Sequence, residues 1–208
     1  MDSRGGTFVR MSSSRVPQVD YPHLPSREHN PLLESSLQAT WCTLLIQAVR
    51  HTLAHTDALV TGNTPFVPPD GGPHTAPDLM VLPGLAGRNV GRYEIGRDGP
   101  PPSVCVEVVS PSNTRSVIDR RCRRWLDAGV TEVYVLDPER ETVEQVAVTD
   151  GALIRSDARG VHSPGMHLSF ATVDGRIALC CPGGRVVTYD DDPFGQTAEP
   201  ASGVAVSR

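Results

Sequence analysis

Two acidic residues lie where a charge is costly to bury. Glu107 falls inside an apolar run at 104–109, and Asp78 follows a proline at the head of a second apolar run at 79–81. A lone carboxylate in such a strand loses its hydration, so each needs a cationic partner. Two carboxylates on neighbouring buried strands make a site for a hard divalent cation, which prefers oxygen ligands and can carry a hydrolytic water. The alternative is that each carboxylate pairs with an arginine or lies at a strand end. Either residue taken alone favours that alternative, whereas the pair favours the metal site.

The segments around these acids predict an α/β fold. Residues 32–55 repeat apolar side chains at three- and four-residue steps, which is typical of an amphipathic helix. A second helix is predicted at 113–128, because Gly129 is a good left-handed stop. Strands are predicted at 58–67, 76–82, 103–109, 132–136, 142–148, 152–154 and 177–181. This order predicts a central mixed β-sheet flanked by helices, with one helix on each side.

Composition limits the size and the setting of this fold. The 208 residues are 38% hydrophobic and 5% aromatic, which is enough for one core but hardly for two. We therefore expect one domain at 31–189, between a disordered arm at 1–30 that is rich in Ser, Arg and Pro and a disordered tail at 190–208. No apolar run has membrane-spanning length and the start has no signal pattern, so the sequence predicts a cytoplasmic protein without a membrane partner.

Charge and cysteine content narrow the chemistry. The net charge is −5, which argues against holding nucleic acid by bulk charge and requires any polyanion site to be local. All 19 basic residues are arginine. The five cysteines are an odd number without a CxxC pair, so we expect reduced thiols, mostly in the core.

Two further patterns favour structural roles. His51 and His55 lie four residues apart on the first helix, but the intervening residues lack the glutamate of the zinc-protease motif. A solvated or hydrogen-bonded pair is therefore favoured over a shared metal. Ser110 follows an apolar strand, but no Gly-x-Ser-x-Gly elbow surrounds it, which favours a cap or turn.

A known family shares the order of these motifs. The chain resembles the Uma2 domain, a restriction-endonuclease-like domain of the PD-(D/E)XK nuclease superfamily. The segments that carry this resemblance are Pro77-Asp78, the run 107–112, the helix end at 128–130 and the strand at 132–138. The resemblance implies a PD-(D/E)XK core in which Asp78 and Glu107 bind the metal. It also implies that the carbonyl of Val108 is a further ligand.

The departures from the family concern the helix at 113–128. The lysine of Uma2-like domains lies one turn before an aromatic residue, which here is Trp125, so Arg121 takes its place. An acid one turn earlier in the family matches Val117, although Asp119 is nearby. Arg121 cannot accept a proton at any working pH, but it can stabilise the negative charge of a phosphate transition state. Helical spacing places Arg121 on one stripe of the helix with Val117, Trp125 and Ala128. This spacing predicts that Arg121 points inward with the core residues. The alternative is that Arg121 is a solvated charge on the helix surface.

Other arginines of this helix could contact phosphates. The other faces of this helix carry Arg115, Arg120, Arg123 and Arg124, which predict a local patch that binds nucleic acid. The candidates for phosphate contact are Arg115, Arg120 and Arg124. The alternative is an ordinary solvated helix face. The expectation is thus a DNA endonuclease with Mg²⁺ or Mn²⁺ as cofactor and a weakened site. A catalytically impaired nuclease fold that binds nucleic acid or protein is the alternative, and a homodimer is left open.

Overall fold

The structure, a computed structural model, describes the backbone of residues 31–189 and their side chains from residue 37 onward. The arm expected at 1–30 and the tail expected at 190–208 lie outside the described residues.

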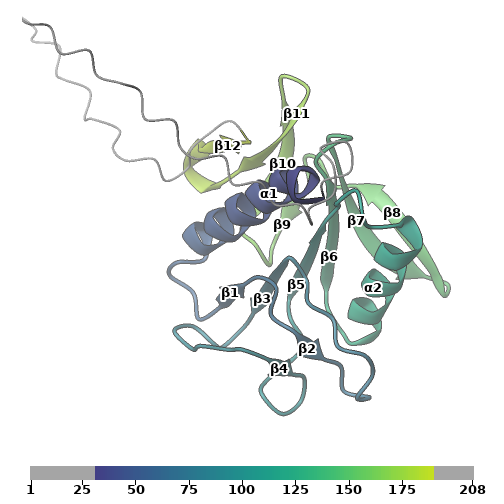
Figure 1. Cartoon of the computed structure of the whole chain (residues 1–208). Coiled ribbons are helices and arrows are strands. Elements are labelled where there is room, and N and C mark those ends of the chain that lie inside the picture. Colours follow the sequence, from purple (N-terminus) through teal and green to yellow (C-terminus); the bar gives the residue numbers. More distant parts are fainter. Residues whose placement is uncertain (1–30, 190–208) are drawn as a thin grey trace, which may run out of the picture. The chain divides into compact units, whose positions relative to one another are not determined.

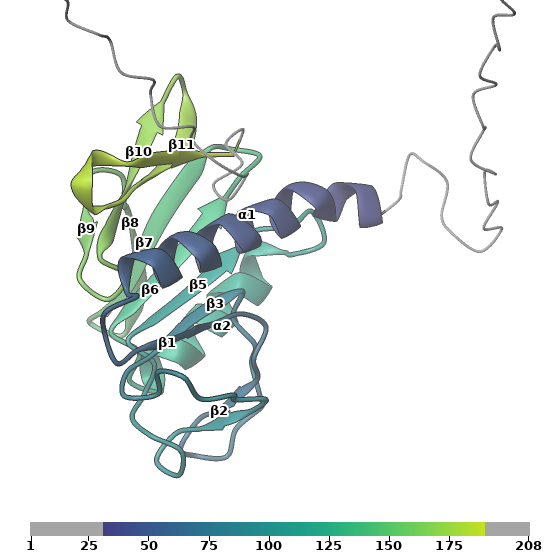
Figure 2. The same cartoon turned by 90° about the vertical axis from the view of Figure 1, so that its left-hand side faces the viewer.

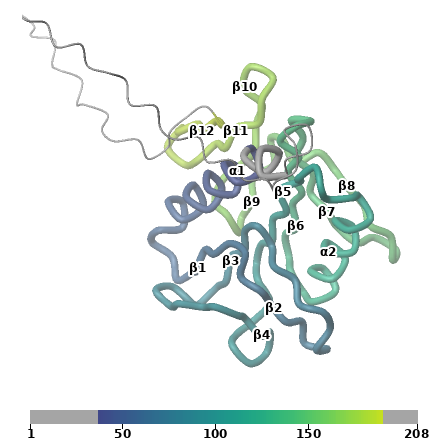
Figure 3. The backbone as a smooth tube through the Cα atoms, viewed as in Figure 1, coloured from purple at the N-terminus to yellow at the C-terminus, as the bar shows by residue number. Residues whose placement is uncertain are grey.

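A six-stranded mixed sheet forms the centre of the described chain (Figure 1). In spatial order its strands are β1 (Leu59–Thr61), β3 (Leu79–Leu82), β5 (Val104–Val108), β6 (Glu132–Asp137), β7 (Thr142–Thr149) and β8 (Ala152–Asp157). β5 and β6 run parallel, and the other neighbours run antiparallel. Helix α2 (Arg115–Asp127) connects the parallel pair, as the tube in Figure 3 traces. β5, α2 and β6 therefore form a βαβ unit.

The two described α-helices cover opposite faces of this sheet (Figures 1 and 2). α1 (Pro31–Thr52) lies across one face and α2 lies against the other. Alternate residues of β5 join the core on the α1 side: Val104, Val106 and Val108. Cys105 joins the core on the α2 side, so alternation directs Glu107 toward α2 as well. The predicted α/β architecture is confirmed, and neither described helix is long and apolar enough to cross a membrane.

A second, four-stranded antiparallel sheet packs into the same core as α1. Its strands are β9 (His162–Ser163), β10 (Leu168–Val173), β11 (Arg176–Cys180) and β12 (Val186–Thr188), with a short 3₁₀ helix at Pro182–Gly184. The rings of Tyr134 in β6 and Phe170 in β10 lie 5.5 Å apart between their centroids. Only β11 was predicted from the sequence, so the other three strands of this sheet are additions.

The strand predicted at 58–67 is wrong in one respect, because the structure divides it. β1 joins the main sheet, whereas β2 (Phe66–Val67) pairs with β4 (Tyr93–Glu94) in a two-stranded parallel sheet. The chain turns at Gly62 and Asn63, where Asn63 has a positive φ of 53° and its N–H donates to the carbonyl of Pro77 at 2.9 Å. A Cβ on Gly62 would lie 2.6 Å from the carbonyl oxygen of Asp78. The turn therefore packs the end of β1 against the segment that carries Asp78.

Candidate metal site

Asp78 and Glu107 meet at one end of the sheet. The antiparallel register of β3 and β5 pairs Leu79 with Val106, so the next position outward pairs Asp78 with Glu107. Asp78 Oδ2 accepts a hydrogen bond from the backbone N–H of Val108 at 2.8 Å. The structure thus brings together the two acids that the sequence singled out, at the carboxyl end of β5, where ligands of parallel α/β sheets commonly bind.

Glu107 is fully buried, with 0% of its surface exposed. One carboxylate oxygen, Oε1, forms an ion pair with Nη1 of Arg121. The other oxygen, Oε2, is buried without a hydrogen-bond partner. Burial raises the pKa of Glu107 to about 7, the charge of Asp78 adds to this rise, and Arg121 opposes it. The oxygen without a partner shows that Arg121 alone does not satisfy this carboxylate.

Asp78 is also buried, and it contacts the opposite helix. The side chains of Gln38 and Cys42, one turn apart on α1, hydrogen-bond to its carboxylate. Burial raises the pKa of Asp78, while its bonds from Val108 and Gln38 oppose the rise. Burial next to Asp78 also raises the pKa of the Cys42 thiol to about 12. The site is therefore lined by both helices, with α1 at Asp78 and α2 at Glu107.

Gln38 also reaches the third expected ligand. Its Nε2 donates to the carbonyl oxygen of Val108 at 3.1 Å. Sequence reasoning missed both Gln38 and Cys42, although a signal was available. They precede the buried residues Leu45 and Val49 at helical spacing and so share the face of α1 that packs on the sheet.

Arg121 reaches Glu107 from the margin of the inward stripe of α2. The fully buried residues of that stripe are Ile118, Cys122 and Trp125, followed by Ala128 after the helix. Arg121 keeps 37% of its side chain exposed, and Val117 is half-buried. The predicted stripe is therefore displaced by about one residue, but Arg121 does point toward the sheet, where it pairs with Glu107. Trp125 fixes the helix, because its Nε1 donates to Oγ1 of buried Thr75 at 2.8 Å, three residues before Asp78.

Asp119 does not supply the missing acid of the site. Its Oδ1 pairs with Nη2 of Arg155 at 2.6 Å, and Arg155 also bonds Glu144 on β7 at 2.6 Å. Arg115 joins the same network, at 3.4 Å from Asp119 and 3.5 Å from Glu144. Two carboxylates therefore lie beside exposed Arg115, and its expected contact with phosphate stays a prediction.

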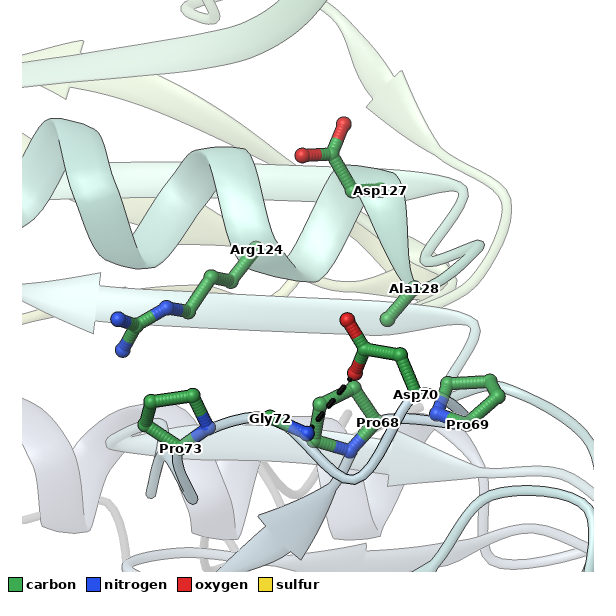
Figure 4. Close-up of a pocket in the computed structure, with 8 residues that line it drawn as sticks. All are labelled: Pro68, Pro69, Asp70, Gly72, Pro73, Arg124, Asp127 and Ala128. Atoms are coloured by element: carbon green, nitrogen blue, oxygen red, sulfur yellow. Dashed lines mark hydrogen bonds between the residues drawn. The ribbon is translucent and has the colours of Figure 1, made fainter.

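Arg120 and Arg124 remain candidates for phosphate contact. Both are exposed, and neither has a carboxylate partner within the described part of the chain. Arg124 extends over Pro73 and lines a cavity of about 230 Å³ against the proline-rich loop at 68–73 (Figure 4). In that loop Asp70 accepts a hydrogen bond from the N–H of Gly72 at 2.9 Å, while Asp127 points away from it (Figure 4).

The donor set fits a hard divalent cation. The carboxylates of Asp78 and Glu107 and the carbonyl of Val108 are all oxygen donors, and buried Oε2 of Glu107 has an unused lone pair that faces no donor. No cluster of three or more His, Cys, Asp or Glu side chains that could hold a metal occurs among residues 37–189, His51 and His55 included. Two carboxylates with a carbonyl suit Mg²⁺, which keeps several of its waters when bound by proteins.

The fold and the site define a restriction-endonuclease-like α/β protein. A family model described as "Uma2: Putative restriction endonuclease" matches residues 32–165. The chain therefore belongs to the Uma2 family, as its motifs predicted. Among solved structures, it is similar to a crystal structure of "a putative nuclease belonging to DUF820" from Anabaena variabilis ATCC 29413. Identity is 15% over 62% of this chain and 72% of that chain, with a TM-score of 0.49. A comparison with curated protein sequences gives no match.

Proposed function

We propose that this protein is a Mg²⁺- or Mn²⁺-dependent endonuclease that hydrolyses DNA phosphodiester bonds. Membership of the Uma2 family supports nuclease activity in general. The observation that carries the metal dependence is buried Glu107, whose Oε2 has no partner although Asp78 adds a second negative charge beside it. A native protein rarely leaves a buried carboxylate oxygen unsatisfied unless a ligand uses it.

Each residue of the site has a distinct role in this proposal. Asp78, Glu107 and the carbonyl of Val108 would hold the ion at the end of β5. Bound there, a divalent ion supplies Lewis-acid polarisation of the scissile phosphate and an activated water. Arg121 lies against Glu107 with a third of its side chain open to solvent, so it can bind a non-bridging phosphate oxygen without leaving the site.

Arg121 also explains why we expect a slow enzyme. Its guanidinium stays protonated and cannot act as a general base, unlike a lysine in the same place. It can still stabilise the extra negative charge on phosphorus in the transition state. We therefore infer a site that retains charge stabilisation but is weakened in proton transfer.

The nucleic acid would approach along the exposed side of α2. Arg120 and Arg124 present uncompensated charges there, and Arg121 lies on the same helix between them. A short basic row suits a sugar-phosphate backbone, which supplies affinity without base recognition. This local row is compatible with the acidic net charge of the chain.

A second candidate is a nuclease fold that has lost turnover and binds nucleic acid or protein. Two observations favour it: arginine replaces the family lysine, and half-buried Val117 replaces an acid, for which Asp119 does not compensate. Intact Asp78 and Glu107 favour the enzyme.

A plasmid-nicking assay with Mg²⁺ or Mn²⁺ separates the two candidates. We expect the wild type to nick supercoiled DNA and Glu107→Ala to lower the rate about 100-fold or more, because the metal loses a ligand. Exposed Glu139 provides a matched control, since Glu139→Ala removes a carboxylate that is not among the proposed metal ligands. Binding of DNA by the wild type without nicking in either metal would establish the second candidate.

A further inference from the structure

The amide of Gln38 lies between two oxygens that the proposed metal would bind. Its Nε2 donates to the carbonyl of Val108 at 3.1 Å, and its side chain also hydrogen-bonds to the carboxylate of Asp78. Resting on the proposed function, we propose that Gln38 keeps the metal site closed. Its NH₂ group takes the place of a cation until that side chain rotates away.

The chemistry of the partners fixes the orientation of this amide. A backbone carbonyl can only accept hydrogen bonds, so the nitrogen of Gln38 must face Val108. An ionised Asp78 is likewise acceptor-only. The NH₂ group has two hydrogens, and these two acceptors use both. Oε2 of Glu107 has no hydrogen-bond partner, so it receives no donor from Gln38 either.

The contact is also competitive with metal binding. A divalent ion at Asp78 and Val108 would occupy the space of the NH₂ group and would use the same lone pairs. Two hydrogen bonds to partly buried oxygens must therefore break before the ion can enter. Cys42, one turn along α1, donates to Asp78 as well, so α1 as a whole covers this ligand. Gln38 thus lowers the affinity for metal and stabilises the metal-free protein.

Titration calorimetry with MnCl₂ on the full chain tests this role without relying on cleavage. Gln38→Ala removes both donors, and we expect Mn²⁺ to bind about tenfold more tightly. Gln38→Glu cannot donate to Val108 and adds a third carboxylate, so we expect still tighter binding. Gln47 lies on the same helix, is half-buried, and makes no contact with Asp78 or Val108. The matched controls Gln47→Ala and Gln47→Glu should bind Mn²⁺ within about twofold of the wild type.

The outcomes separate this inference from the proposed function. If Gln38→Ala binds Mn²⁺ as weakly as the wild type, or more weakly, the closing role of Gln38 is overturned while the metal site stands. If Gln38→Ala binds more tightly but neither protein nicks DNA, the closing role is supported and the endonuclease proposal fails. If no variant binds Mn²⁺, both are overturned. Should Gln38→Ala not fold, Gln38→Leu removes the same donors while filling the space, and the same comparison applies.

Discussion

Glu132 and Glu107 are carboxylates at opposite ends of the same parallel strand pair. The register of β5 and β6 aligns Glu132 with Val104 at the start, and Glu107 with Val135 near the carboxyl end. Glu132 accepts hydrogen bonds from the hydroxyl of Tyr134 at 2.9 Å, from Oγ of Ser163 at 2.5 Å and from the N–H of Gly165 at 2.7 Å. Glu107 has one ion pair and one buried oxygen without a partner.

The difference separates a carboxylate that joins two sheets from one that keeps a buried oxygen without a hydrogen-bond partner. Every donor to Glu132 is neutral, and two of them come from the segment around β9 in the small sheet. A Cβ on Gly165 would lie 2.8 Å from Oε1 of Glu132, so only glycine lets that backbone approach. Glu107 is less well satisfied although it is more deeply buried. At the carboxyl end of a parallel strand pair, a buried carboxylate that lacks a hydrogen-bond partner indicates a functional role. At the other end, a carboxylate whose oxygens are hydrogen-bonded indicates a structural role.

The largest effect is expected at the structural end. Glu132→Ala should lower the free energy of unfolding by about 3–4 kcal/mol, because the buried hydroxyls of Tyr134 and Ser163 lose a charged acceptor. Urea denaturation followed by circular dichroism measures the change. Glu139→Ala removes an exposed carboxylate and should change stability by less than about 0.5 kcal/mol. A loss no larger for Glu132→Ala than for this control would erase the distinction between the two ends.

Glu107→Gln should raise the free energy of unfolding near pH 8, whereas Glu132→Ala should lower it. The pKa of Glu107 is raised in the folded protein from 4.5 to about 7, so folding opposes its ionisation. Wild-type stability should therefore fall as the pH rises from 4.5 through 7, by about 3 kcal/mol, and it should be unaffected by this group below that range. Glu107→Gln should be about 2–3 kcal/mol more stable than the wild type near pH 8, with the gain vanishing near pH 4.

Urea unfolding at both pH values, in EDTA so that no metal binds, measures this difference. Asp78 is present in both proteins, and its own raised pKa cancels to first order. A Glu107→Gln protein that is less stable than the wild type at pH 8 would mean that Glu107 is a structural carboxylate like Glu132.

The smallest effect is expected for Arg121→Lys. Lysine keeps the positive charge beside Glu107 and restores the group usual in the family, so nicking should stay equal or rise, by up to about tenfold. Arg121→Ala should lower nicking about tenfold and the free energy of unfolding by about 1 kcal/mol, because buried Glu107 loses its cation. Initial nicking rates measure this, with Arg123→Lys on another face of α2 as the control. Unchanged nicking by Arg121→Ala would remove its catalytic role.

The sequence predicted the acids of the site because each breaks a local rule. A carboxylate inside an apolar run demands an explanation, and both Asp78 and Glu107 do so without any knowledge of the fold. Arg121 followed from the need for a nearby cation and from its place before Trp125. Gln38 breaks no rule, since glutamine is ordinary in an amphipathic helix. Its contact with Val108 arises only when α1 docks on the sheet.

Other differences between the sequence-based expectations and the structure also arise from contacts between segments that are distant in the sequence. The inward stripe of α2 is centred on Ile118 and Cys122, because Trp125 is fixed by its bond to Thr75 from a distant loop. The alternation of buried Leu168 and Phe170 in β10 was a visible signal, whereas two-residue β9 carries almost none. The division of the strand at 58–67 depends on the packing of Gly62 against Asp78, which no local pattern encodes.

The contacts of the site span very different lengths of chain. Arg121 and Glu107 are 14 residues apart, Asp78 and Val108 are 30 apart, and Gln38 and Val108 are 70 apart. The entropic cost of closing a loop grows with its length, so we expect the ion pair to form early, with the local contacts of the βαβ unit. We expect the bond of Gln38 to form last, when α1 docks. In the folded chain the same helix covers the site, so we expect a chain in which α1 has not yet docked to present its two acids uncovered.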